Sequence, residues 1–81
     1  MSDTPPAILV LDDEPNSVNL LRITLGMDFD VHTATDGPSA LAILAAHPEI
    51  ALALIDQRMP GMTGTEFIKQ TIEPYPNLVR I

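Results

Sequence analysis

The sequence predicts an α/β fold in which a doubly wound parallel sheet has helices between its strands. Two observations predict it. Continuous apolar runs of strand length occur at Ala7–Leu11 and Ile50–Ile55, and the intervening segments carry apolar residues at helical spacing. A run without polar alternation suits a strand that is buried on both faces, as in a parallel sheet. Strands that alternate with helices in this way call for right-handed crossovers within one sheet.

Seven elements are expected along the chain. They are a strand at residues 7–11, a helix at 15–25, a strand at 29–34, a helix at 38–47, a strand at 50–55, a helix at 64–73 and a strand at 78–81. Pro15 and Pro38 suit first helical turns, where the missing N–H costs nothing. Gly26 is a stop signal for the first helix. Residues 63–66, Thr-Gly-Thr-Glu, match a capping box for the third helix.

The strand at residues 29–34 differs from the two apolar runs. It contains His32 and Thr33, and this polarity favours an edge position in the sheet. His47 suits the end of the second helix, where the helix dipole favours a cation. The chain has two histidines and no cysteine. A thiolate metal site is therefore excluded, and two histidines are too few for a zinc site without help from carboxylates.

The composition limits the size of the domain and its partners. A chain of 81 residues and 8.8 kDa allows one small domain. Eleven acidic residues against four basic ones give a net charge of −7. Phosphate backbones and anionic lipids would repel such a chain, so neither direct nucleic-acid binding nor membrane binding is expected. No apolar stretch is long enough to span a membrane and no secretory signal is visible, so the expected compartment is the cytoplasm.

Three aspartates follow the two apolar runs. Asp12 and Asp13 come directly after the first run, and Asp56 comes directly after the second. In an open α/β sheet, ligands bind beyond the carboxyl ends of the strands, where the strand order reverses. If the two strands are neighbours, three carboxylates converge there, and a hard cation such as Mg²⁺ would relieve their repulsion. The sequence thus predicts a metal-assisted phosphoryl site, against the simpler interpretation of Asp13 as a helix N-cap.

A loop pattern after Asp56 narrows this prediction. Residues 56–64 fit the pattern D-x-x-M-P-x-x-x-G. The matching features, in chain order, are Asp12-Asp13 after the first apolar run, Asp36-Gly37 before Ala40-Leu41, Asp56 at the end of the second run, and the loop Met59-Pro60 to Gly64. With these features in this order, the chain resembles the receiver domain of two-component response regulators.

The resemblance implies a flavodoxin-like (βα)5 receiver fold with the strand order 2-1-3-4. The motifs span Ile8 to Gly64, and the order of elements matches as far as Ile81. Residues 1–81 are then expected to be the N-terminal portion of a receiver domain, with the output domain outside them. Receivers also carry a Ser or Thr after the fourth strand and a Lys after the fifth, and both are expected beyond Ile81.

The resemblance also implies roles for individual residues. Asp56 occupies the phosphoacceptor position, which receives a phosphoryl group from a histidine kinase or phosphotransfer protein and thereby switches the output domain. The implied cofactor is Mg²⁺ or Mn²⁺. Asp13 would bind it directly and Asp12 through water, while Asp56 and the backbone carbonyl of Arg58 would complete the ligand set. On this basis the chain is a signalling module and not an enzyme.

Two other functions stay open at this point. One is a receiver-like interaction module that docks a partner without phosphorylation. The other is an aspartyl-phosphate phosphatase of α/β fold. Such enzymes place a second acid two residues after the nucleophile, and Arg58 at that position argues against this class. The strand from Leu78 is expected to be an apolar sheet edge, which can pair with a second copy, so a homodimer is also expected.

Overall fold

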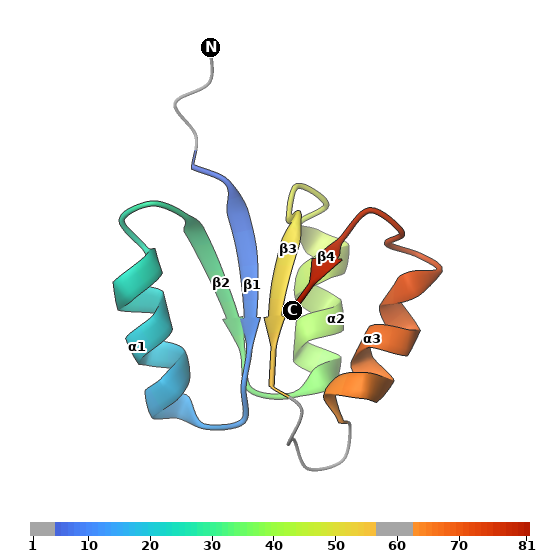
Figure 1. Cartoon of the computed structure of the whole chain (residues 1–81), viewed down its shortest axis with the longest axis horizontal. Coiled ribbons are helices and arrows are strands. Elements are labelled where there is room, and N and C mark those ends of the chain that lie inside the picture. Colours follow the sequence, from blue (N-terminus) through green and yellow to red (C-terminus); the bar gives the residue numbers. More distant parts are fainter. Residues whose placement is uncertain (1–4, 57–62) are drawn as a thin grey trace.

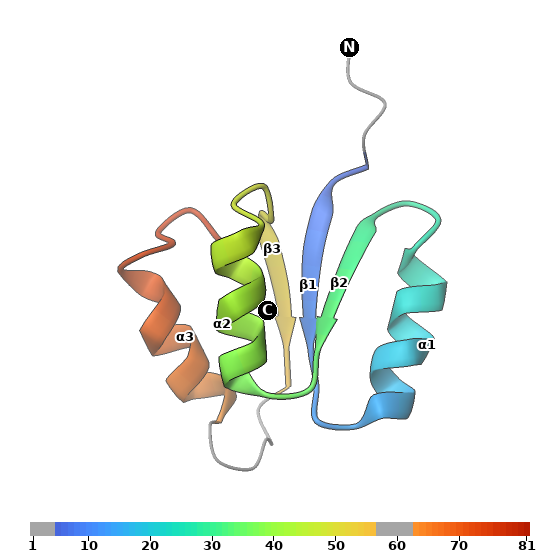
Figure 2. The same cartoon turned by 180° about the vertical axis from the view of Figure 1, so that it is seen from behind.

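Four parallel strands form one sheet, and three helices pack around it (Figures 1 and 2). The computed structural model describes residues 5–56 and 63–81. In chain order the elements are β1 (Ala7–Leu11), α1 (Pro15–Leu25), β2 (Asp30–Ala34), α2 (Gly37–Ala46), β3 (Leu52–Ile55), α3 (Gly64–Ile72) and β4 (Val79–Arg80). The predicted alternation of strands and helices is therefore confirmed.

The strand order in the sheet is β2-β1-β3-β4. β1 lies at the centre, where Ile8 is aligned with Val31 of β2 on one side and with Leu52 of β3 on the other. The edge position predicted for the polar second strand is confirmed, and β4 forms the other edge of the sheet. Because β1 and β3 are neighbours, the aspartates that follow them lie at the same end of the sheet.

The two faces of the sheet are covered unequally. Side chains alternate between faces along a strand, so Leu9 and Leu11 face one way and Val10 the other. Leu9 packs in the main core with Leu44 of α2 and Phe67 of α3, and all three are almost completely buried. The opposite face is covered by α1, which packs against β1 and β2.

This unequal cover corrects one expectation. The apolar run at 50–55 was predicted to be buried on both faces, but Leu52 and Leu54 are only half-buried. Because α1 lies over β1 and β2, the α1 face of β3 opens onto a groove of about 280 Å³ that Leu54 lines. β3 is therefore buried on one face and partly open on the other.

Three strand boundaries also differ from the predicted ones. β2 begins at Asp30, one residue later than expected, and β4 contains two residues. β3 begins at Leu52 because Ile50 donates its backbone N–H to the carbonyl oxygen of His47, at 3.1 Å, in the turn after α2. Ile50 is still buried in the core. The apolar run at 50–55 therefore predicted the burial of Ile50 correctly but not the residue at which the strand begins.

Local signals account for the starts of the helices. Pro15 and Pro38 lie in the first turns of α1 and α2, as predicted. The Asp36 carboxylate caps α2 by accepting the Ser39 N–H at 2.7 Å. The hydroxyl of Thr63 caps α3 by accepting a backbone N–H at 3.2 Å from Glu66, the last residue of the predicted capping box.

Hydrogen bonds from Arg80 of β4 hold the C-terminal end of α3 against this strand. The Nε of Arg80 donates to the hydroxyl of buried Thr71 at 2.9 Å. Its Nη2 donates to the carbonyl oxygens of Thr71 and Tyr75 at 2.9 and 2.6 Å. The Thr71 carbonyl lies in the last turn of α3, where a cation is favourable, and Tyr75 follows in the turn after the helix. In the described part of the chain, no helix is both long and apolar enough to cross a membrane.

Candidate metal centre

The parallel sheet brings Asp12, Asp13 and Asp56 to its carboxyl edge. The backbone N–H of Asp56 donates to the carbonyl oxygen of Leu11 at 2.8 Å, which continues the pairing of β3 with β1 by one residue. The side chain of Asp56 therefore emerges beside the residues that follow β1. One carboxylate oxygen from each of the three aspartates lies within 4.8 Å of the other two. The predicted convergence is found in the structure.

The two neighbouring carboxylates raise the free energy of the charged form of Asp13. The pKa of Asp13 is raised above its ordinary value of 3.8, first by desolvation and then by the charge of Asp56 and a hydrogen bond with it. Asp12 adds a smaller effect of the same sign. This cluster, Asp12, Asp13 and Asp56, is called the acidic cluster below. A cation placed among its oxygens would relieve the repulsion.

The N-cap of α1 is Glu14, not Asp13. The Glu14 carboxylate accepts the backbone N–H of Asn16 at 3.1 Å, and its own N–H donates to the Asp12 Oδ1 at 3.0 Å. The simpler interpretation of Asp13 as an N-cap is therefore wrong. Because Glu14 satisfies the helix start, the Asp13 side chain lies with the other two carboxylates.

The donors of the acidic cluster fit a hard divalent cation. All three are carboxylates, and Mg²⁺ binds through a few carboxylate oxygens together with water and phosphate oxygens. Asp12 and Asp56 are half-buried and Asp13 is exposed, so the cluster is accessible from solvent. The predicted carbonyl ligand of Arg58 and the Met59-Pro60 loop lie outside the described residues.

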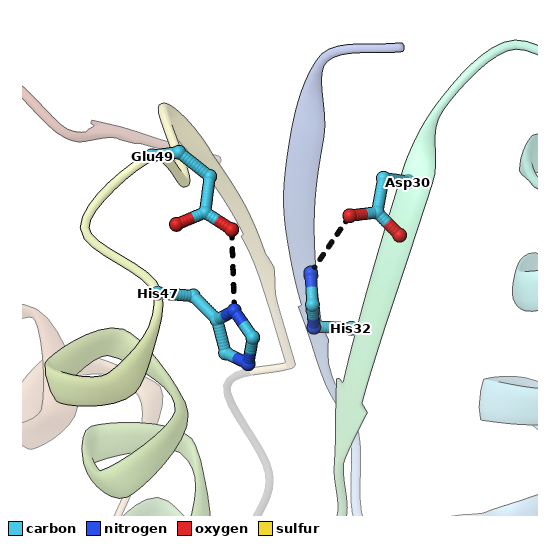
Figure 3. Close-up of polar contacts among 4 residues, drawn as sticks. All are labelled: Asp30, His32, His47 and Glu49. Atoms are coloured by element: carbon cyan, nitrogen blue, oxygen red, sulfur yellow. Dashed lines mark hydrogen bonds and ion pairs between the residues drawn. The ribbon is translucent and has the colours of Figure 1, made fainter. Parts of the chain in front are cut away.

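The structure also collects four polar side chains at the opposite end of the sheet. They are Asp30 and His32 of β2 together with His47 and Glu49, which follow α2 (Figure 3). In the sequence the two histidines have separate local explanations, and nothing there predicts a site for the two carboxylates. The available signal was that each carboxylate stands two residues from a histidine. Only the packing of α2 over β2 brings the two pairs together.

Comparison with known proteins places these observations in a family. The family model described as "Response regulator receiver domain" matches residues 8–81. The hydrogenase transcriptional regulatory protein HoxA of Cupriavidus necator is 46% identical over 81 residues, which are 100% of this chain and 17% of that protein. The response regulator protein PilR of Pseudomonas aeruginosa is 36% identical over 69 residues, which are 84% of this chain and 15% of that protein.

Solved structures agree with the fold. The chemotaxis protein CheY4 of Vibrio cholerae superimposes with a TM-score of 0.89 at 29% identity, covering 95% of this chain and 66% of that chain. A protein described as adenylate cyclase from Rhodopirellula baltica also gives a TM-score of 0.89, at 38% identity, and covers 94% of this chain and 56% of that one. The chain thus spans 17% and 15% of the two curated relatives and two thirds or less of these structures.

Proposed function

Since this chain belongs to the response regulator receiver domain family, we propose that it is a phosphoacceptor module in which Asp56 receives a phosphoryl group. The donor would be a histidine kinase or a phosphotransfer protein, and the chain would act in the cytoplasm as a switch and not as an enzyme. The single observation that carries the proposal is the convergence of Asp12, Asp13 and Asp56 at the carboxyl edge of the sheet.

The chemistry of the proposed step is a nucleophilic displacement at phosphorus. A carboxylate oxygen of Asp56 attacks the phosphorus of a phosphohistidine, so that an O–P bond forms, the P–N bond breaks and the imidazole leaves. The product is an acyl phosphate on Asp56. The position of Asp56 at the end of β3, beside β1, supports its role as the acceptor, because its carboxylate lies between the strand ends and solvent.

The acidic cluster would hold Mg²⁺ or Mn²⁺ for this step. Asp13 would bind the ion directly and Asp12 through water, with Asp56 and the backbone carbonyl of Arg58 as further ligands. When bound, the ion neutralises charge on the phosphoryl oxygens, and the positioning of reactants is then the main contribution of the protein. The raised pKa of Asp13 supports this role, because a neighbouring cation would lower that pKa again.

A downstream output domain would receive the signal. The matched segment is 17% of HoxA, so most of that relative lies outside the receiver region. This supports the proposal that the chain acts on a separate output domain. A homodimer through the β4 edge stays a prediction.

Phosphorylation by a small donor tests the proposal. The full-length protein that contains residues 1–81 is incubated with acetyl phosphate and Mg²⁺, and the phosphorylated residue is identified by mass spectrometry. We expect one label on Asp56, no label in Asp56→Asn, and slower labelling in Asp13→Asn. Glu73→Gln removes an exposed carboxylate after α3 and is the matched control, which should label at the normal rate.

Two outcomes would contradict this function. A label that survives Asp56→Asn would show that another residue is the acceptor. No label on the full-length protein without substitutions, although Mg²⁺ shifts the amide signals of residues 12–14, would favour an interaction module that is not phosphorylated.

A further inference from the structure

The packing of α2 over β2 brings two histidines and two carboxylates together at the amino edge of the sheet. Asp30, His32, His47 and Glu49 are called the histidine cluster below. Asp30 and His32 are two residues apart on β2, so their side chains share the face that α2 covers. His47 is the C-cap of α2, and Glu49 follows it in the next turn. Figure 3 shows the two imidazole rings side by side, each beside a carboxylate.

The distances within the histidine cluster are short. The His32 Nε2 lies 3.1 Å from the Asp30 Oδ2, and the His47 Nδ1 lies 3.1 Å from the Glu49 Oε2. The centroids of the imidazole rings are 4.2 Å apart, and the rings are tilted by 38°. One donor atom from each of His32, His47 and Glu49 lies within 4.8 Å of the other two.

These distances are close to those of a coordination shell. Two ligand atoms of a tetrahedral zinc site are about 3.2–3.5 Å apart, because each lies roughly 2.0–2.2 Å from the ion. The His47 and Glu49 donor atoms, at 3.1 Å, already have nearly this spacing. The remaining donor, from His32, lies within 4.8 Å of the other two and would have to approach them to the roughly 3.2–3.5 Å that such a shell allows.

We propose that the histidine cluster is a second metal site, which binds Zn²⁺ through His32, His47 and Glu49. Two imidazoles and one carboxylate form a donor set that zinc accepts, with water in the fourth position. Imidazole donors favour zinc and other first-row transition ions over Mg²⁺. The site therefore differs in metal preference from the acidic cluster, and it does not rest on the phosphoacceptor function.

Asp30 would act as a positioning residue. Ligating histidines commonly donate their second ring N–H to a carboxylate, which fixes the tautomer and the ring orientation. If the Nε2 of His32 donates to Asp30, the Nδ1 is the nitrogen that faces the ion. The His32 side chain is 19% exposed, whereas His47 and Glu49 are 40% and 55% exposed. His32, on the strand, is thus the ligand held most firmly by its surroundings. His47 and Glu49, at and after the end of α2, are more exposed and can adjust their side chains to the ion.

Competition against a chromophoric zinc chelator measures the affinity of the full chain. We expect one zinc site that Mg²⁺ does not displace. His47→Gln and Glu49→Gln should each lower its affinity at least tenfold, and Asp30→Asn should lower it roughly 10–100-fold. Glu73→Gln, a change at an exposed carboxylate outside both clusters, is the matched control and should leave this affinity unchanged. Circular dichroism of the metal-free variants checks that each one folds.

Two spectroscopic readouts make the assignment specific. Co²⁺ in place of Zn²⁺ should give visible ligand-field absorption that His32→Gln and His47→Gln lose and Glu73→Gln keeps. In the unchanged chain, substoichiometric Zn²⁺ should shift the amide signals of residues 30–33 and 46–50. Zinc affinity unaltered by His47→Gln, amide shifts confined to residues 12–14 and 56, or the absence of cobalt absorption would each overturn the proposal.

Discussion

The two ends of the same sheet carry polar clusters that differ in their donors and in their electrostatics. At the carboxyl edge, three carboxylates face one another, and the pKa of Asp13 is raised by desolvation and by its acidic neighbours. At the amino edge, each carboxylate has a histidine beside it. The pKa of Glu49 is lowered there, first by a backbone hydrogen bond and then by His47.

The two clusters therefore differ in the ions that would stabilise them. In the acidic cluster the ionised form of Asp13 is disfavoured, so a nearby cation, or a proton on Asp13, would lower the free energy of the site. The histidine cluster already satisfies its groups through hydrogen bonds, so an ion there would replace favourable contacts and would have to bind through stronger ligand bonds. We therefore expect the carboxyl edge to respond to any hard divalent cation and the amino edge only to ions that favour imidazole.

The largest expected effect comes from a change that affects both ends together. Leu9 is completely buried in β1, where it is aligned with His32 of β2 and Ala53 of β3. We expect Leu9→Ala to lower the free energy of unfolding by about 3 kcal/mol, measured by urea denaturation. In so small a domain this should weaken Mg²⁺ binding and Zn²⁺ binding alike.

Ile23→Ala is the control for this prediction. Ile23 is 72% exposed on α1, and its truncation should change the stability by no more than about 0.5 kcal/mol. If Leu9→Ala abolished the response at one edge and kept the other intact, the two ends would not share one cooperative core.

Intermediate losses of stability are expected from variants at the two ends of α3. Arg80→Met removes the donors to the carbonyl oxygens of Thr71 and Tyr75, and we expect a loss of about 2 kcal/mol. Thr63→Ala removes only the N-terminal cap, for which we expect about 1 kcal/mol. Urea denaturation of both variants measures the difference. Equal losses would mean that the two helix ends are held equally strongly.

The smallest expected effect is on the pH dependence of thermal stability. Substitutions at the two edges of the sheet should change this stability in opposite directions. Because the pKa of Asp13 is raised in the folded chain, its ionisation destabilises the fold as the pH rises above 3.8. In buffer with a chelator, Asp13→Asn should therefore raise the thermal midpoint at pH 7 and lose this advantage in acid.

Glu49 should behave in the opposite way. Its pKa is lowered from 4.5, so its contribution to stability is present above that value and is lost as the pH falls through the folded pKa. Glu49→Gln should lower the midpoint at pH 7 and match the unchanged chain in acid. Thermal melts across pH 3 to 7 measure both variants. Shifts of the same sign would contradict the electrostatic contrast between the two ends.

The order of strands and helices, and the aspartates that lie at the carboxyl edge of the sheet, could be predicted from the sequence alone. The apolar runs at 7–11 and 50–55 are uninterrupted and end on aspartates. Proline and threonine marked helix starts, because capping depends on the few residues around each helix end. Since parallel strands end at one edge, the strand pattern alone placed Asp12, Asp13 and Asp56 at that edge, whereas their convergence also required β1 and β3 to be neighbours.

Other features depended on which elements cover which surface. The half-burial of Leu54 reflects the position of α1 over β1 and β2, and no residue near Leu54 encodes that position. The choice of Glu14 over Asp13 as N-cap is local, because the helix starts at Pro15 and Glu14 is the residue before it. Local propensity could not reveal the half-burial of Leu54, because the deciding contacts are long-range.

The histidine cluster was decided only by the tertiary structure. A histidine inside a strand and another at a helix end have ordinary local explanations, an edge position for His32 and a favourable helix dipole for His47. The rings come within 4.2 Å only because α2 packs back against the sheet and ends at its amino edge, so that His47 reaches toward His32 of β2. The local hydrogen bonds could form in separate peptides, whereas the distance between the two pairs is set by the packing of Leu44 and Ala40 of α2 on the sheet.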